Sequence, residues 1–179
     1  MKSAVNTGTY EKTAPQDGLS GAQLVWAVIV LSLGVGMSAL DTAIANTALP
    51  AMAQQLHASP ADSVWIVNAY QLAMVATLLP VAALGETIGY KRVYIAGMAI
   101  FTAASLACAL AWSLPVLIAG RLFQGLGASA LMGVNSALIR TVYPGKLHGR
   151  GFGNNALVVA IGFAIGPSLA SIILSVSSW

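Results

Sequence analysis

The stretch that decides the fold is Arg121-Leu122-Phe123-Gln124-Gly125-Leu126-Gly127-Ala128-Ser129-Ala130. It places an arginine inside an apolar run, Leu114–Ile139, that contains no other charged residue. A guanidinium at membrane depth costs roughly 3 kcal/mol on insertion scales, so it is usually paired or faces a water-filled cavity. The side chain of Arg121 therefore needs a partner, and the rest of the chain has to supply it.

The composition indicates a membrane protein. The chain has 179 residues, of which 58% are hydrophobic and 7% are charged, whereas a soluble domain carries about 25% charged residues. Asp41 and Arg121 are the only charged residues within five apolar runs, each long enough to cross a bilayer as a helix. These runs are 24–49, 64–84, 93–112, 114–139 and 152–176. We predict an all-α, polytopic helical membrane protein with five transmembrane helices.

The basic residues lie on alternate loops. They are Lys2 and Lys12 before the first run, Lys91 and Arg92 between the second and third, and Arg140, Lys146 and Arg150 between the fourth and fifth. The positive-inside rule then predicts a cytoplasmic N-terminus, with residues 1–23 as a polar cytoplasmic tail and residues 24–179 as the transmembrane region. Basic residues scattered over short loops do not form a nucleic-acid-binding surface.

Asp41 is the candidate partner of Arg121. It stands 8 residues from the end of the first run, and Arg121 stands 7 residues from the start of the fourth. At 1.5 Å per residue these offsets are about 12 Å and about 10 Å. The two charges thus lie at similar depth on antiparallel helices, in the outer half of the membrane. We hypothesise that they share one polar cavity; the alternative is an interior ion pair that serves helix packing only.

Four amides at membrane depth are candidates for lining a cavity or binding substrate. Asn46 follows Asp41 in the first run, and Gln124 is one turn from Arg121. Asn68 and Gln71 are three residues apart, so they share a helix face. Polar side chains at such positions either line a cavity or bond neighbouring helices together, and both alternatives remain open for Asn68 and Gln71.

A short loop joins the second and third runs. We expect residues 84–92 to form a tight cytoplasmic turn, with Gly85 and Gly89 permitting it and Glu86 within reach of Lys91 and Arg92. An exposed ion pair there contributes little stability. The shortness of the loop still holds the two helices together.

Two groups of glycines indicate close helix packing. Gly125 and Gly127 resemble a dinucleotide-binding fingerprint, but no strand precedes them and no acidic residue follows at the required distance. Small residues instead let neighbouring backbones approach. The second group is in the fifth run, where a flat glycine face and a proline predict a bendable, closely packed helix. Its members are Gly153, Gly162, Gly166 and Pro167.

With these motifs in order, the chain from Leu40 to Trp179 resembles the N-terminal part of major facilitator superfamily transporters, in the drug:proton antiporter-2, fourteen-span branch. The first-span signature is matched by Leu40, Asp41, Asn46, Ala48, Leu49 and Pro50, and the loop signature by Leu84, Gly89 and Lys91, with Glu86 in place of the usual aspartate. The fourth-span signature is matched by Arg121, Gln124, Gly125, Gly127 and Ala128. The fifth-span antiporter signature is matched by Gly153, Gly162, Gly166 and Pro167, with Ala170 in its last position.

The resemblance implies proton-coupled export of small lipophilic or cationic drugs by alternating access, in the bacterial inner membrane. It implies proton coupling at Asp41 and Arg121 and conformational gating by the 84–92 loop. The proton is the coupling ion, and no other cofactor or metal is expected. With one carboxylate at depth and no serine–histidine pair or metal cluster in the spans, an enzyme is not expected.

The number of spans also carries an expectation. A major facilitator half has six spans, and transport needs two halves around a midplane site. We therefore expect a truncated product or a fragment that does not transport alone and that needs the missing C-terminal spans or a full-length relative as its partner. The alternative is a non-transporting membrane interaction module that associates with such a relative. The bilayer and a drug substrate are the other expected partners.

Overall fold

The computed structural model describes residues 18–176, and these residues fold into long helices without a strand. The helices are α1 (Gly21–Gln55), α2 (Pro60–Ile88), α3 (Tyr90–Ala109), α4 (Leu114–Val142) and α5 (His148–Val176), with a short 3₁₀ turn η1 (Gly145–Leu147) before α5. All five are long and apolar enough to cross a membrane. The predicted all-α fold with five membrane-spanning helices is therefore confirmed.

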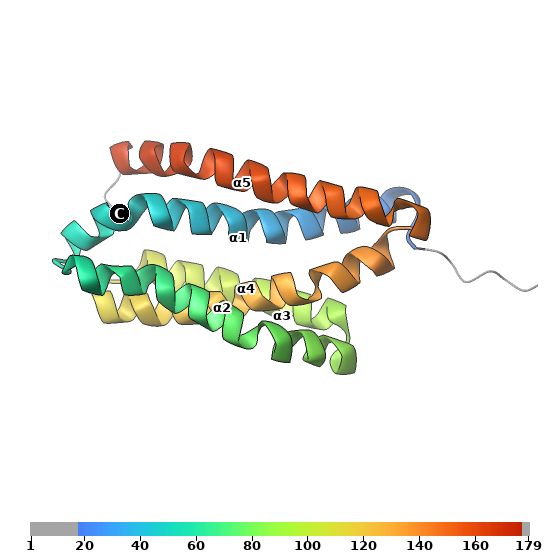
Figure 1. The fold of residues 1–179 in the computed structure, drawn as a ribbon, viewed down its shortest axis with the longest axis horizontal. Helices are drawn as coiled ribbons and strands as arrows, with labels where there is room; N and C mark the ends of the chain where they lie inside the picture. The colour runs from blue at the N-terminus through green and yellow to red at the C-terminus, as the bar shows by residue number, and fades with distance from the viewer. Residues whose placement is uncertain (1–17, 177–179) are drawn as a thin grey trace, which may run out of the picture.

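Consecutive helices run in opposite directions along the bundle (Figure 1). The start of α1, the α2–α3 junction and the α4–α5 junction lie at one end, which we call the junction end. The basic residues of the described chain other than Arg121 gather at the junction end, in or beside these junctions: Lys91, Arg92, Arg140, Lys146 and Arg150. Lys2 and Lys12, and most of the predicted 1–23 tail, lie outside the described residues.

The first connection is shorter than predicted, because helices extend into it from both sides. We expected α1 to end at Leu49, but it continues through Pro50 to Gln55. The next helix begins at Pro60, where Ser59 caps it by accepting the Asp62 backbone N–H at 3.1 Å. Proline is favoured at a first helical position, and a serine cap satisfies a free donor there. At the other end of α1, residues 21–23 are already helical rather than part of a tail.

The predicted turn over residues 84–92 is reduced to a single residue. Gly85 and Glu86 belong to α2, Lys91 and Arg92 belong to the first turn of α3, and Gly89 alone separates the helices with a φ of 97°. Gly85 is needed for a different reason, since a Cβ there would lie 2.8 Å from both Tyr90 and Val134. The turn is therefore tight, as predicted, but shorter than residues 84–92, and Gly85 is not part of it.

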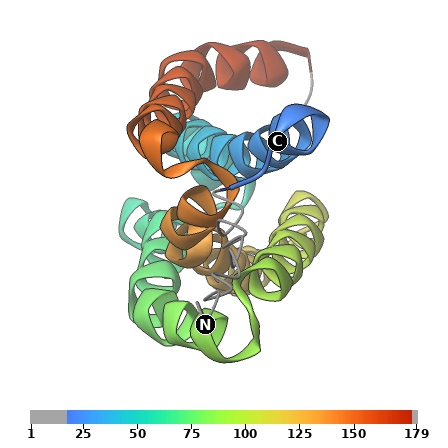
Figure 2. The same cartoon turned by 90° about the vertical axis from the view of Figure 1, so that its right-hand side faces the viewer.

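Helix α4 is the centre of the packing, with α2 and α3 against it and α5 packed along α1 (Figure 2). Glycines permit these approaches. A Cβ on Gly127 would meet the Phe101 backbone of α3, and one on Gly125 would meet the Tyr70 carbonyl of α2. Gly162 and Gly166 face Ala39 and Ala43 of α1 in the same way. At these four glycines the neighbouring helices thus approach too closely for a side chain.

Gly153 and Pro167 do not belong to this packed face. Gly153 is exposed and has nothing within 4 Å of the position of a Cβ. It precedes Gly162 by nine residues, which at 3.6 residues per turn places it on the opposite side of the helix. Pro167 is also exposed, inside a continuous α5. The prediction of one flat face for all the fifth-run glycines was therefore wrong for Gly153.

Two apolar clusters form the core. One includes Phe101, Leu131 and Val134 and extends toward the junction end, and the other includes Met52, Ile66 and Leu117 near the opposite end. Many large apolar side chains point outward instead, such as Leu79 with 79% of its surface exposed. An apolar exterior of this extent suits contact with lipid.

Candidate functional site

The arginine of the fourth apolar run is buried and paired. Arg121 on α4 is 4% exposed, and its Nη1 atom donates to Oδ2 of Asp41 on α1 at 2.7 Å. This is the one ion pair among residues 18–176. Counting residues from the ends of the first and fourth runs predicted that Asp41 and Arg121 lie at similar depth, and the structure places them in contact.

Gln124 closes a three-residue network with the ion pair. Its Nε2 atom donates to Oδ1 of Asp41 at 2.8 Å, and its Oε1 atom accepts from Nη1 of Arg121 at 2.7 Å. Arg121 and Gln124 lie three residues apart on α4, which aligns both side chains toward α1. Both carboxylate oxygens of Asp41 are thus bonded to α4. Charge-assisted hydrogen bonds of this kind are roughly twice as strong as neutral ones.

Helix α2 supplies two further contacts that sequence reasoning missed. The Nε atom of Arg121 donates to the backbone carbonyl of Ile66 at 3.2 Å. The guanidinium carbon of Arg121 lies 4.7 Å from the centre of the Tyr70 ring, a cation–π distance. Ile66 and Tyr70 are one helical turn apart, so one stripe of α2 makes both contacts. The position of Tyr70 along the second run could have made it a candidate partner of Arg121. The sequence does not show which neighbouring helix the Tyr70 side chain faces.

A cavity of about 380 Å³ adjoins the network. Its lining includes Asp41, Arg121 and Gln124 together with Ser105 and Cys108 of α3, and the remaining walls are mostly apolar. The side chain of Asp41 is 20% exposed against 5% for Arg121. The carboxylate is thus the more accessible member of the pair.

The other predicted cavity residues lie elsewhere. Asn46, Asn68 and Gln71 are exposed and do not line this cavity. The Nδ2 atom of Asn46 donates to the Thr42 carbonyl of its own helix at 2.8 Å. Of the four amides proposed from the sequence, Gln124 alone lines the cavity of the ion pair. The spacing of Asn68 and Gln71 correctly predicted that they share a face of α2, but it did not predict that this face is exposed.

The predicted gating residues are at the junction end, away from the ion pair. Glu86, Tyr90 and Arg140 border a separate cavity of about 470 Å³ there. Glu86 forms no ion pair with Lys91 or Arg92 in the described chain. Within residues 18–176 no group of three or more histidine, cysteine, aspartate or glutamate side chains could hold a metal ion.

This architecture defines a class: a multi-pass helical membrane protein with a buried ion pair beside an intramembrane cavity. The chain belongs to the Major Facilitator Superfamily, whose family profile matches residues 31–179. It is 49% identical over 163 residues to the "Uncharacterized transporter YebQ" of Escherichia coli, covering 91% of this chain and 36% of that protein. Membership in a transporter superfamily and a lipid environment follow from this match.

Two other relatives carry more specific names. The "Riboflavin transporter RibZ" of Clostridioides difficile is 37% identical over 86% of this chain and 34% of its own length. The "Methylenomycin A resistance protein" of Bacillus subtilis is 33% identical over 97% of this chain and 36% of its own length. The chain thus spans about a third of the length of the curated relatives it matches.

Proposed function

We propose that this chain is the N-terminal part of a proton-coupled antiporter that exports small lipophilic or cationic compounds by alternating access. The observation that carries the proposal is the Asp41–Arg121 pair, with its 2.7 Å contact beside a cavity. An intramembrane carboxylate with a fixed cationic partner is a recurrent element of proton relays.

The mechanism rests on competition for one carboxylate. When Asp41 is ionised, it accepts from Arg121 and Gln124 and can also attract a cationic solute in the cavity. When Asp41 takes a proton, its charge attraction to Arg121 is lost, and the α1–α4 contact weakens. Alternate opening of the cavity to the two sides would then link proton entry to solute exit. In this scheme Arg121 and Gln124 position the carboxylate and Asp41 carries the proton.

The names of the relatives support small organic molecules as the substrate class. Methylenomycin A resistance points to export of an antibiotic, and the riboflavin transporter points to a planar vitamin. The apolar walls of the cavity favour the lipophilic part of such a molecule. The fourteen-span antiporter branch and placement in the bacterial inner membrane belong to the same proposal.

The experiment replaces the matching third of the Escherichia coli relative with this chain and measures uptake of ethidium, a lipophilic cation, into everted vesicles, which corresponds to export from the cell. Asp41→Asn and Arg121→Ala should abolish export driven by a pH gradient while membrane insertion stays normal. Asn46→Ala is the matched control, since Asn46 is exposed and bonds only its own helix. Undiminished export by the Arg121→Ala chimera would refute the role assigned to the pair. The 179-residue chain expressed without further spans is expected to give no export.

A further inference from the structure

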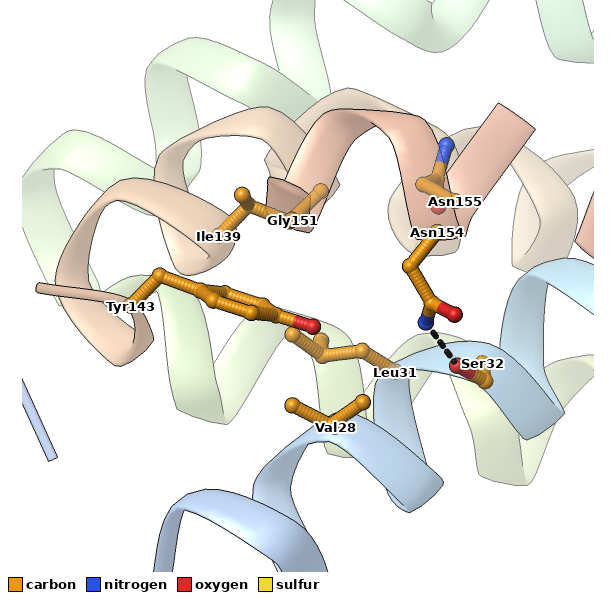
Figure 3. Close-up of a pocket in the computed structure, with 8 residues that line it drawn as sticks. All are labelled: Val28, Leu31, Ser32, Ile139, Tyr143, Gly151, Asn154 and Asn155. Carbon is orange, nitrogen blue, oxygen red and sulfur yellow. Dashed lines mark hydrogen bonds between the residues drawn. The ribbon is translucent and has the colours of Figure 1, made fainter. Parts of the chain in front are cut away.

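A second polar cluster lies nearer the junction end, between α1, α4 and α5 (Figure 3). The Nδ2 atom of Asn135 donates to Oδ1 of Asn155 at 2.8 Å. Beside it, Nδ2 of Asn154 donates to Oγ of Ser32 at 3.2 Å. Asn135 follows Arg121 by fourteen residues, which is about 21 Å along a helix. The cluster is thus separate from the ion-pair network and has no part in the transport scheme above.

Asn135 has an unmet hydrogen-bonding atom. The residue is 5% exposed, and its Oδ1 atom has no hydrogen-bond partner among the described residues. Reversing both amides would keep the bond to Asn155 and leave the nitrogen of Asn135 unpaired instead. Leaving such an atom unpaired in a buried site costs about 1–3 kcal/mol. Either orientation therefore calls for one more hydrogen-bonding group near the cluster.

A small pocket lies beside this cluster and is bordered by Asn154, Asn155 and Ser32, though not by Asn135. Its volume is about 10 Å³, which is near the lower limit of about 10–15 Å³ for holding one water molecule and is too small for a larger solute. Ser32, Asn154, Asn155 and Tyr143 contribute its polar groups, and the remaining lining residues are Val28, Leu31, Ile139 and Gly151. In Figure 3 the Tyr143 hydroxyl points across the pocket toward the Asn154–Ser32 pair.

We propose that this pocket is a binding site for one structural water molecule that joins α5 to α1 and α4. Within residues 18–176 the hydroxyl of Tyr143 and Oδ1 of Asn154 have no protein hydrogen-bond partner assigned, so each can bond to the water. A buried water typically makes about three hydrogen bonds, and these groups together with Ser32 provide that number. Asn155 connects the pocket to the rest of the cluster, since it lines the pocket and accepts the hydrogen bond from Asn135 of α4. The water adds to the two direct polar contacts between these helices, Asn135 with Asn155 and Asn154 with Ser32.

The test is hydroxyl-radical labelling by X-ray radiolysis of the full chain in detergent, in ¹⁸O-labelled water. Radicals form at bound waters, so a buried tyrosine next to a water is labelled and a dry one is not. Tyr143 is 8% exposed and Tyr94 is 3% exposed, and the Tyr94 hydroxyl already donates to the backbone carbonyl of Val30 at 3.1 Å. We expect labelling of Tyr143 and none of Tyr94.

Two variants decide whether a water in the pocket is responsible for the labelling of Tyr143. Val28 lines the pocket, so Val28→Leu should fill it and remove the labelling of Tyr143. Val25→Leu is the matched control, since Val25 is 56% exposed and does not line the pocket. If Val28→Leu fails to fold, Ser32→Ala removes a polar wall without adding volume and should reduce the labelling. Absence of Tyr143 labelling in the unmodified chain, or labelling that survives both Val28→Leu and Ser32→Ala, would overturn the proposal.

Discussion

Nη1 of Arg121 lies 2.7 Å from Oδ2 of Asp41, across a sequence separation of 80 residues. Each side chain compensates the charge that the other brings into the membrane. The pair is also the point at which α1 is bonded to α4, since Gln124 adds a second bond from α4 to the same carboxylate at 2.8 Å.

Removing the carboxylate should destabilise the protein more than removing the guanidinium. Asp41→Leu leaves Arg121 buried with no charged partner, and arginine cannot neutralise itself by losing its proton. Arg121→Leu leaves a partly exposed carboxyl that can take up a proton. Breaking a buried pair from one side costs about 3–5 kcal/mol, and we expect the upper part of that range for Asp41→Leu. Thermal unfolding in detergent measures both variants.

The double variant Asp41→Leu/Arg121→Leu provides the control for this prediction. With both charges gone, neither is left unpaired, so the stability should recover beyond that of Asp41→Leu alone. Additive losses in the double variant would show that the two residues do not interact.

Packing of α5 on α1 depends on the absence of a side chain at Gly166. Gly166→Ala would bring a Cβ against Ala43, and relieving that overlap should cost about 1–3 kcal/mol. Gly153→Ala is the matched control on the same helix, because nothing lies near its Cβ position. There the higher helix propensity of alanine should leave stability unchanged or raised by up to about 1 kcal/mol. Equal effects of the two substitutions in thermal unfolding would contradict the packing assignment.

The α2–α3 junction depends on the backbone of Gly89. Its φ of 97° is a conformation that side chains disfavour, so Gly89→Ala should destabilise the chain by about 1–2 kcal/mol although no atom lies within 4 Å of the new methyl. Gly149→Ala, at an equally open position inside the first turn of α5, is the control and should be neutral. A neutral Gly89→Ala in the same unfolding assay would mean that the junction relaxes to another conformation.

The basic residues at the junction end predict that this end faces the cytoplasm. In a Cys108→Ala background, His57→Cys should react with a membrane-impermeant maleimide on intact cells, because residue 57 is exposed at the opposite end. Lys146→Cys, exposed between α4 and α5, should react only after the membrane is opened. The reverse pattern of labelling would place the junction end outside.

Several features of the fold and site could be predicted from sequence because they depend on composition and on position along a helix. Apolar length gave the five helices, and depth gave Asp41 as the partner of Arg121. Helix ends were harder, since Pro50 stays within α1 while Ser59 and Pro60 start α2. Asn68 and Gln71 were candidates either for lining a cavity or for bonding helices together, yet both are exposed on α2. Spacing fixes which residues share a face and leaves open what that face meets.

The sequence by itself determined that Arg121 must be compensated, because an unpaired guanidinium is too costly at membrane depth. Only the tertiary structure decided how this happens. Packing of α4 on α2 turned Tyr70 and the Ile66 carbonyl toward the guanidinium, and contact of α4 with α1 bonded Gln124 to both charged groups. These contacts depend on the relative rotation of helices. That rotation is set by side-chain fit between helices, notably at Gly125 and Gly127, which no single run of residues specifies.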